Sequence, residues 1–184
     1  TGSRAGLRAP EKPLKVQNAP PEGEVTPLTI EKIPETVRKM QIEVGSFTFG
    51  RFLRITPDTR GFRIQFTYPM FEEGSTRVTP DGAKLLDLAA MVLKPYEPRV
   101  AVIELVGHSS PEEDEGGLRL SLARSHAAHR AVTRSDAVYR LDSRRLAASG
   151  RGPYDLGDDA RLESGHARHR RVDFLIRLAP GPKP

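Results

Sequence analysis

The most constraining feature of this 184-residue sequence is a well-capped helix that lies between two strand-like segments. Thr79 can accept a hydrogen bond from the first turn, Pro80 suits the first helical position, and Asp81 favours the positive end of the helix dipole. Apolar residues then recur at helical spacing until Pro95. A helix placed between strands must cross over a sheet, which predicts a layered α/β fold.

The segments on either side of this helix carry strand patterns. Residues 62–68 alternate apolar and polar side chains, which indicates a half-buried strand, and residues 47–55 form the other half of a hairpin. Residues 100–106 are apolar except for one glutamate, which indicates a mostly buried strand. The other expected elements are helices over 28–40 and 118–133 and strands over 145–148 and 171–178. We therefore expect an α/β (α+β) fold, a two-layer sandwich of a mixed β-sheet with helices on one face.

Proline-rich termini flank this folded part. Residues 1–27 contain five prolines and apolar residues without a period, so we expect a disordered linker. Residues 28–61 would supply a linker helix and a leading strand, residues 62–178 the main domain, and residues 179–184 a tail.

Composition excludes several kinds of function. The chain has no cysteine, which rules out disulfides, thiol catalysis and cysteine-based zinc sites. No run approaches the roughly 20 apolar residues that a membrane helix needs. The first residues lack a signal-peptide pattern and an initial methionine, so we expect a membrane anchor upstream of residue 1.

The whole chain has a net charge of +5, and its positive charge is concentrated in the second half. Residues 118–177 contain 13 arginines, no lysine and 7 acidic residues. Arginine without lysine favours forked contacts with carboxylate or phosphate, although a genome rich in arginine codons explains it equally well. A nucleic-acid surface is an alternative, but the acidic loop at 112–115 and the 6% aromatic content count against it.

Four segments resemble motifs of the OmpA-like peptidoglycan-binding domain family, most closely its flagellar stator (MotB-type) branch. The family patterns are F-x-x-G-S before the first helix, V-x-G-H-T-D, N-x-x-L-S-x-x-R-A and N-R-R-V-E-I. The matching segments here are F-E-E-G-S at 71–75, V-G-H-S at 106–109, L-S-L-A-R at 120–124 and R-R-V-D at 170–173. The resemblance covers about residues 62–178, with the segments in the family's order.

This resemblance implies a non-catalytic domain that binds the peptide stem of peptidoglycan and needs no cofactor or metal. In the family, the aspartate of G-H-T-D pairs with the ligand's ammonium group and the arginine of L-S-x-x-R binds its carboxylate. Carried over, Arg124 would clamp the carboxylate and Arg170 would support it. Gly74 would line the site through its backbone, and His108 belongs to the same site.

Two departures from the family concern the site directly. Ser110 stands where the family has the clamp aspartate, and Gly117 stands where it has an asparagine. A hydroxyl carries no charge to pair with an ammonium, and losing one partner of such a buried pair typically costs about 2–5 kcal/mol. Glu112 and the acidic residues at 113 and 114 can supply a substitute carboxylate, or they form a solvated loop.

The binding hypothesis requires the Arg124 guanidinium to be open to water in a shallow pocket. The alternative is that Arg124 forms an internal ion pair within the fold. If the guanidinium is sealed against an internal partner with no groove beside it, the wall-binding interpretation fails. An OmpA-like domain that serves protein interactions or acts as a scaffold in an envelope complex would then remain.

The resemblance also implies a location and partners. We expect a periplasmic module of the cell envelope, anchored to the inner membrane upstream and carried outward by the proline-rich linker. Its partners would be peptidoglycan, membrane-embedded subunits and a second copy of the chain in a homodimer, and no nucleic acid.

Two further motifs have simpler explanations. Ser109 follows a strand as in a nucleophile elbow, but Pro111 and an acidic loop come next instead of a helix, so a turn is expected. The pairs His126 and His129, and His166 and His169, have spacings that occur in metal sites, but arginines surround them. We expect these histidines to be exposed to solvent.

Overall fold

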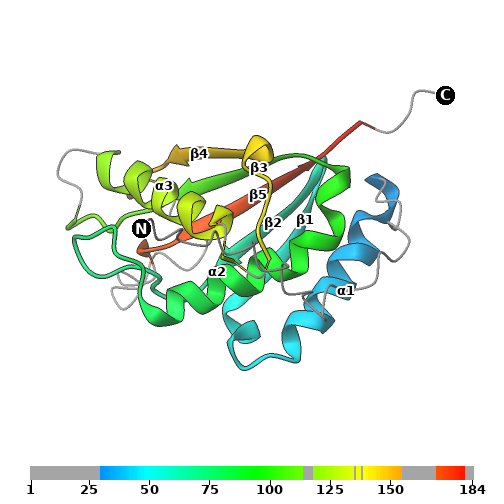
Figure 1. Cartoon of the computed structure of the whole chain (residues 1–184), viewed down its shortest axis with the longest axis horizontal. Coiled ribbons are helices and arrows are strands. Elements are labelled where there is room, and N and C mark those ends of the chain that lie inside the picture. Colours follow the sequence, from blue (N-terminus) through cyan, green and yellow to red (C-terminus); the bar gives the residue numbers. More distant parts are fainter. Residues whose placement is uncertain (1–29, 114–117, 135, 138, 155–168, 181–184) are drawn as a thin grey trace, which may run out of the picture.

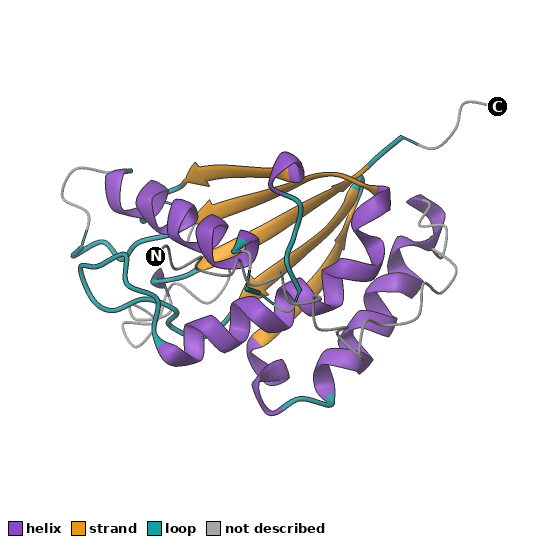
Figure 2. Ribbon diagram, viewed as in Figure 1, coloured by secondary structure: helices purple, strands orange, loops and turns teal. Residues whose placement is uncertain are grey.

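The computed structural model describes residues 30–113, 118–134, 136–137, 139–154 and 169–180. Three α-helices lie over one face of a five-stranded sheet (Figures 1 and 2). The expected two-layer α/β architecture is confirmed. The main elements are α1 (Ile33–Gly45), β1 (Leu53–Asp58), β2 (Gly61–Phe66), α2 (Pro80–Leu93), β3 (Val100–Gly107), α3 (Arg119–Thr133), β4 (Leu146–Gly150) and β5 (Val172–Leu178). Short 3₁₀ segments span Ile30–Lys32, Thr48–Phe52, Lys94–Arg99 and Ser143–Arg145.

The last strand of the chain lies in the middle of the sheet. The strand order is β1-β2-β5-β3-β4, and only the β3–β4 pair is parallel. The chain reaches β3 from β2 through α2 and reaches β4 from β3 through α3, and β5 then enters between β2 and β3. The sheet is therefore mixed, as the sequence predicts.

One continuous row of apolar side chains crosses the covered face of the sheet. Ile55 lies opposite Ile64, Ile64 opposite Phe174, and Phe174 opposite Leu105, and all four are fully buried. The neighbouring positions on the other face, such as Arg54 on β1 and Gln65 on β2, are exposed or half-buried. This alternation is typical of a sheet that packs one face against helices.

The structure departs from the sequence prediction in two elements. Residues 48–52 form a 3₁₀ turn instead of a strand, because the chain must reverse between α1 and β1; the N–H of Phe47 donates to the carbonyl of Val44 at this reversal. The first helix spans Ile33–Gly45 and not 28–40, since Pro34 occupies its first turn. The expected mostly buried strand is confirmed as β3, in which the half-buried Glu104 accepts from Ser149.

Gly107 decides where α3 starts relative to the sheet. A Cβ atom at Gly107 would lie 1.7 Å from the carbonyl oxygen of Ser121, so no larger residue fits between the end of β3 and the first turns of α3. This close approach places Arg124, one turn further along α3, beside the end of β3. No helix in the described part of the chain is long and apolar enough to cross a membrane.

A candidate carboxylate site

Three segments that are distant in sequence meet beyond the end of β3. They are the loop before α2, the loop that follows β3, and the first turns of α3. Gly74 in the first loop has φ of +59°, a left-handed conformation that favours glycine, and it turns its N–H toward the other two segments. Thr79 caps α2 as predicted by accepting from the N–H of Gly82 at 2.9 Å, which holds the start of that helix beside the site.

The guanidinium of Arg124 is the centre of this site, and all five of its N–H groups have an acceptor. Nε donates to the carbonyl of Ser75 at 3.0 Å, while Nη1 and Nη2 donate to the carbonyls of His108 at 3.2 Å and Glu72 at 3.4 Å. Nη1 and Nη2 each also donate to one carboxylate oxygen of Glu113, both at 2.9 Å. Arginine has five N–H donors, so the hydrogen-bonding capacity of Arg124 is fully used.

The carboxylate of Glu113 receives four hydrogen bonds. Besides the two from Arg124, Oε1 accepts from the backbone N–H of Gly74 at 2.8 Å and Oε2 from that of Ser110 at 3.0 Å. Burial alone would raise the pKa of the Glu113 carboxyl, but the hydrogen bonds from Arg124, Ser110 and Gly74 lower it to about 2. Glu113 is therefore ionised at any physiological pH.

The expectation of a water-exposed Arg124 is wrong. The Arg124 side chain is 0% exposed and that of Glu113 is 4% exposed. The physical reason is a tight turn, in which the N–H of Glu113 donates to the carbonyl of Ser110 and directs the Glu113 side chain inward onto the guanidinium. The acidic loop does supply a carboxylate, but it is bound by Arg124 and is not free to pair with a ligand's ammonium.

A groove of about 340 Å³ lies beside the sealed ion pair. Phe71 and Glu72 line it, and the same two residues contact Arg124, through the Phe71 ring at 5.4 Å and the Glu72 carbonyl. Arg170 lines the groove as well, with its side chain 19% exposed and 3.8 Å from the exposed carboxylate of Glu73. Arg124 is thus shielded from solvent, but the residues that contact it also line a surface groove.

A second buried charged cluster supports the loop that follows β3. Nε2 of His108 lies 3.0 Å from Asp173, and Nε of Arg171 donates to the same carboxylate at 3.1 Å. Burial alone would raise the pKa of Asp173, but contacts with His108 and Arg171 lower it. Asp173 also accepts from the backbone N–H of Phe66 on β2. The ring of His108, which the family resemblance implies to be part of the ligand site, lies against Asp173, and the His108 carbonyl accepts from Arg124.

The remaining predicted site residues have different surroundings. Ser110 is buried and contributes its backbone N–H to the site, Glu112 is exposed on the neighbouring turn, and Gly117 lies outside the described residues. The sequence does not identify Glu113 as the partner of Arg124, because its acidic neighbours are chemically similar. Only the folded structure shows which of them lies against the guanidinium. Ser109 is 0% exposed, which is incompatible with a surface nucleophile.

The histidines do not form a metal site within the described part of the chain. His126 is exposed and His129 half-buried on α3, whereas His169 is buried, so the expectation of exposure is wrong for His169. His166 lies outside the described residues. No group of three or more potential ligands occurs among the residues that the structure describes.

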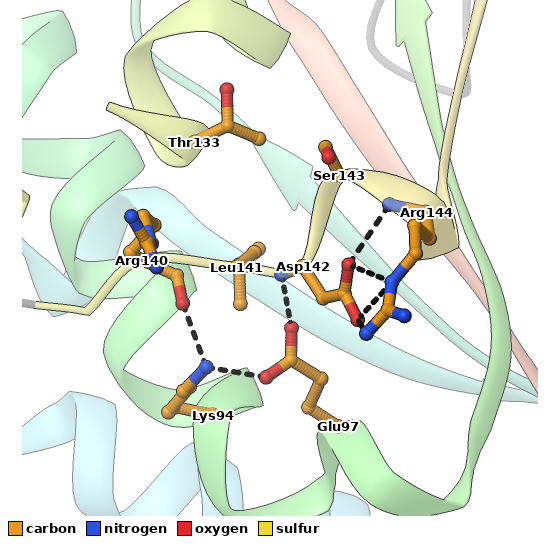
Figure 3. A pocket seen from close by; sticks show the side chains of 8 residues that line it. All are labelled: Lys94, Glu97, Thr133, Arg140, Leu141, Asp142, Ser143 and Arg144. Atoms are coloured by element: carbon orange, nitrogen blue, oxygen red, sulfur yellow. Dashed lines mark hydrogen bonds and ion pairs between the residues drawn. The ribbon is translucent and has the colours of Figure 1, made fainter. Parts of the chain in front are cut away.

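A second pocket, of about 510 Å³, lies at the opposite end of α2 (Figure 3). Lys94 donates to Glu97 and to the carbonyl of Arg140, and Glu97 accepts from the N–H of Asp142. The Asp142 carboxylate pairs in turn with Arg144. These contacts tie the start of the segment before β4 to the end of α2, which is a structural role.

The protein is thus an α/β sandwich with one buried carboxylate site. Backbone N–H groups of the loop before α2 and of the loop after β3, together with Arg124 on α3, bind the carboxylate there. The sequence profile of the OmpA family matches residues 70–170, which is more than half of the chain. The chain belongs to the OmpA family. No curated protein matches it by sequence.

Solved structures with the same fold are distant in sequence. A MotB-like protein from Desulfovibrio vulgaris is 18% identical with a TM-score of 0.66, and the match covers 82% of this chain and 96% of that one. The periplasmic domain of Helicobacter pylori MotB is 13% identical with a TM-score of 0.57, covering 70% and 80%. The cell wall anchor of the T6SS from Pseudomonas aeruginosa is 18% identical with a TM-score of 0.56, covering 78% and 97%.

Proposed function

We propose that this chain is a non-catalytic module of the bacterial envelope that binds peptidoglycan through a carboxylate of the peptide stem. The observation that carries the proposal is the set of four N–H donors, from Arg124, Gly74 and Ser110, that converge on one carboxylate. Membership of the OmpA family supports it, as does the similarity to MotB and to a cell wall anchor.

The donors are arranged as a receptor for a carboxylate, whichever molecule supplies it. Two parallel N–H groups of a guanidinium match the two oxygens, and the backbone N–H groups fix the plane of the carboxylate. In the structure the carboxylate is that of Glu113. The stem peptide carries the same group, and the adjacent groove lined by Phe71 and Arg170 offers room for the rest of the ligand.

We further propose a periplasmic location, with an anchor upstream of residue 1 that connects the domain to membrane-embedded partner subunits. A stator-like role and a homodimer belong to the same proposal. The proline-rich residues 1–27 suit a spacer between such an anchor and the wall.

Co-sedimentation with purified peptidoglycan sacculi tests the proposal. We expect the wild-type chain to pellet with sacculi at moderate salt, and the fraction bound by Arg124→Ala to fall about tenfold or more, since a buried charge pair with the ligand is lost. Arg130→Ala is the matched control, because Arg130 is exposed on the same helix. Free diaminopimelate should release the wild-type chain, a measurement that does not depend on the folding of a variant.

One observation favours a second candidate function, that of a scaffold domain that no longer binds the wall. Arg124 is fully buried and Glu113 occupies its carboxylate position, so the charge of Arg124 is compensated without a ligand. A wild-type chain that stays in the supernatant with sacculi at moderate salt, and binds envelope proteins instead, supports this alternative.

A further inference from the structure

We propose that Glu113 is a built-in competitor for the Arg124 site, and that a zwitterionic ligand binds by exchange with it. The ligand's carboxylate takes the position of the Glu113 carboxylate, and the released Glu113 then pairs with the ligand's ammonium group. The inference rests on the proposed function, which it deepens by naming the residue of this chain that controls access to the Arg124 site.

The first step is the geometry of the Glu113 carboxylate. Each oxygen accepts one N–H of Arg124 and one backbone N–H, with distances between 2.8 and 3.0 Å. Gly74 and Ser110, which provide the backbone donors, come from different loops. A free carboxylate ligand would use the same four donors, so Glu113 occupies a binding position as a ligand would.

The second step is that the donors are held in place without Glu113. The Arg124 guanidinium also donates to the carbonyls of Ser75 and His108, and it lies over the Phe71 ring. These two hydrogen bonds use N–H groups of the guanidinium other than the two that bind Glu113. When Glu113 leaves, the Arg124 half of the donor set remains oriented, which lowers the ordering cost of binding.

The third step is that Glu113 can leave. It reaches the site from a surface turn whose previous residues, Pro111 and Glu112, are exposed. The backbone of this turn is held by the hydrogen bond from the Glu113 N–H to the Ser110 carbonyl, so a change of side-chain torsions can move the carboxylate outward while this hydrogen bond is kept.

The fourth step is charge balance. Separating Glu113 from Arg124 leaves a buried cation and a displaced anion, and both need a partner. A simple carboxylate compensates only the cation, whereas a zwitterion compensates both charges. Ser110, the residue beside the site, has no charge to offer an ammonium, whereas the released Glu113 is an anion that lies next to the position it has vacated.

The first experiment is acetate rescue of the full chain carrying Glu113→Ala. We expect acetate to raise the melting temperature of this variant by several degrees, while chloride at equal ionic strength does not, because acetate fills the vacated position. Wild type and Glu35→Ala, which removes an exposed glutamate from α1, should show no acetate response. A folded Glu113→Ala chain without acetate response overturns the proposal.

The second experiment compares diaminopimelate with pimelate, a molecule of the same length without ammonium groups, by calorimetry. Wild type should bind diaminopimelate more tightly than pimelate. The Glu113→Ala substitution should strengthen pimelate binding about tenfold or more, because Glu113 then no longer occupies the carboxylate position. The preference for diaminopimelate over pimelate should become smaller. Equal affinities in the wild type, or no gain for pimelate in the variant, contradict the exchange.

If Glu113→Ala does not fold, the wild-type chain decides the question by NMR. On titration with diaminopimelate, the side-chain carboxylate carbon of Glu113 should shift toward the solvent-exposed value. The Gly74 and Ser110 amide protons should keep their downfield, hydrogen-bonded shifts. An unchanged Glu113 signal at saturating ligand overturns the proposal.

The outcomes also separate this inference from the proposed function. Acetate rescue and diaminopimelate exchange without retention on sacculi leave the exchange intact and reject peptidoglycan as the ligand. Retention on sacculi without acetate rescue supports wall binding and rejects the role of Glu113.

Discussion

At the scale of single residues, Arg124 is a fully buried charged side chain in which every N–H group has an acceptor. A charged group is buried without large cost only when its charge and its donors are both compensated. Glu113 supplies the charge and two acceptors, and backbone carbonyls supply the other three. The planar fork of arginine is what makes this possible, since an ammonium has three donors and no plane.

Arg124→Lys tests this requirement. Lysine cannot reach both oxygens of Glu113 and the carbonyls of Ser75 and His108 at once, so we expect the free energy of unfolding to fall by about 3 kcal/mol. Urea denaturation measures it, with Arg130→Lys as the exposed control on the same helix. Equal stabilities of the two variants would show that the ion pair contributes little.

Acid titration tests the Glu113 carboxylate. Its pKa is about 2 in the folded chain against an ordinary value of 4.5, so the ionised form stabilises the fold above pH 4.5 and this stabilisation is lost as the pH falls toward 2. The shift corresponds to about 3 kcal/mol for a side chain as buried as this one. Urea denaturation at a series of pH values should show the difference between wild type and Glu113→Gln shrinking below pH 4.5. A constant difference would contradict the assignment.

At the scale of elements, the site depends on how closely α3 approaches the sheet. Gly107 on β3 admits the backbone of Ser121, and the small buried residues Ala127 and Ala128 continue the contact further along α3. Helical spacing predicts α3 and the burial of Ala127 and Ala128, because apolar periodicity is a local property, whereas Leu120, Ala123 and Ala131, also expected to pack, are only half-buried. It does not predict that Arg124 belongs to the buried face, since this depends on acceptors supplied by other loops.

Gly107→Ala tests the helix–sheet contact. The added methyl group meets the Ser121 carbonyl oxygen at 1.7 Å, so α3 must shift, and we expect a loss of about 2–3 kcal/mol in the free energy of unfolding. Gly45→Ala is the matched control, because nothing lies within 4 Å of a Cβ atom at that position. Thermal and urea unfolding of both variants provide the comparison, and equal stabilities would refute the packing argument.

At the scale of the whole molecule, the first and last described elements, α1, β1 and β5, complete the core and the sheet. Residues 30–58 contribute α1 and β1, which pack on the core and pair with β2 respectively, and β5 fills the gap between β2 and β3. The four side chains Ile33, Val37, Met40 and Val44 of α1 are each at most 3% exposed. The folded unit therefore includes the segment before residue 62.

Two truncations test this boundary. Deletion of residues 1–29 should leave the melting temperature nearly unchanged, because the sequence there predicts a linker. Deletion of residues 1–45 removes α1 and uncovers the part of the core that its buried side chains pack against, so we expect a much lower melting temperature or aggregation. Similar melting temperatures for the two truncated chains would show that α1 is dispensable.

Local chemistry along the chain predicts the capped α2, the alternation of β2 and the ends of α3, because caps and periodicity are encoded within a few residues. Only the resemblance to the family motif L-S-x-x-R points to Arg124. Only the tertiary structure decided that Glu113, and not Glu112, meets Arg124, that β5 lies between β2 and β3, and that the guanidinium is sealed. These facts depend on contacts between residues far apart in the sequence, whose free energies are settled by burial and charge compensation in the folded chain.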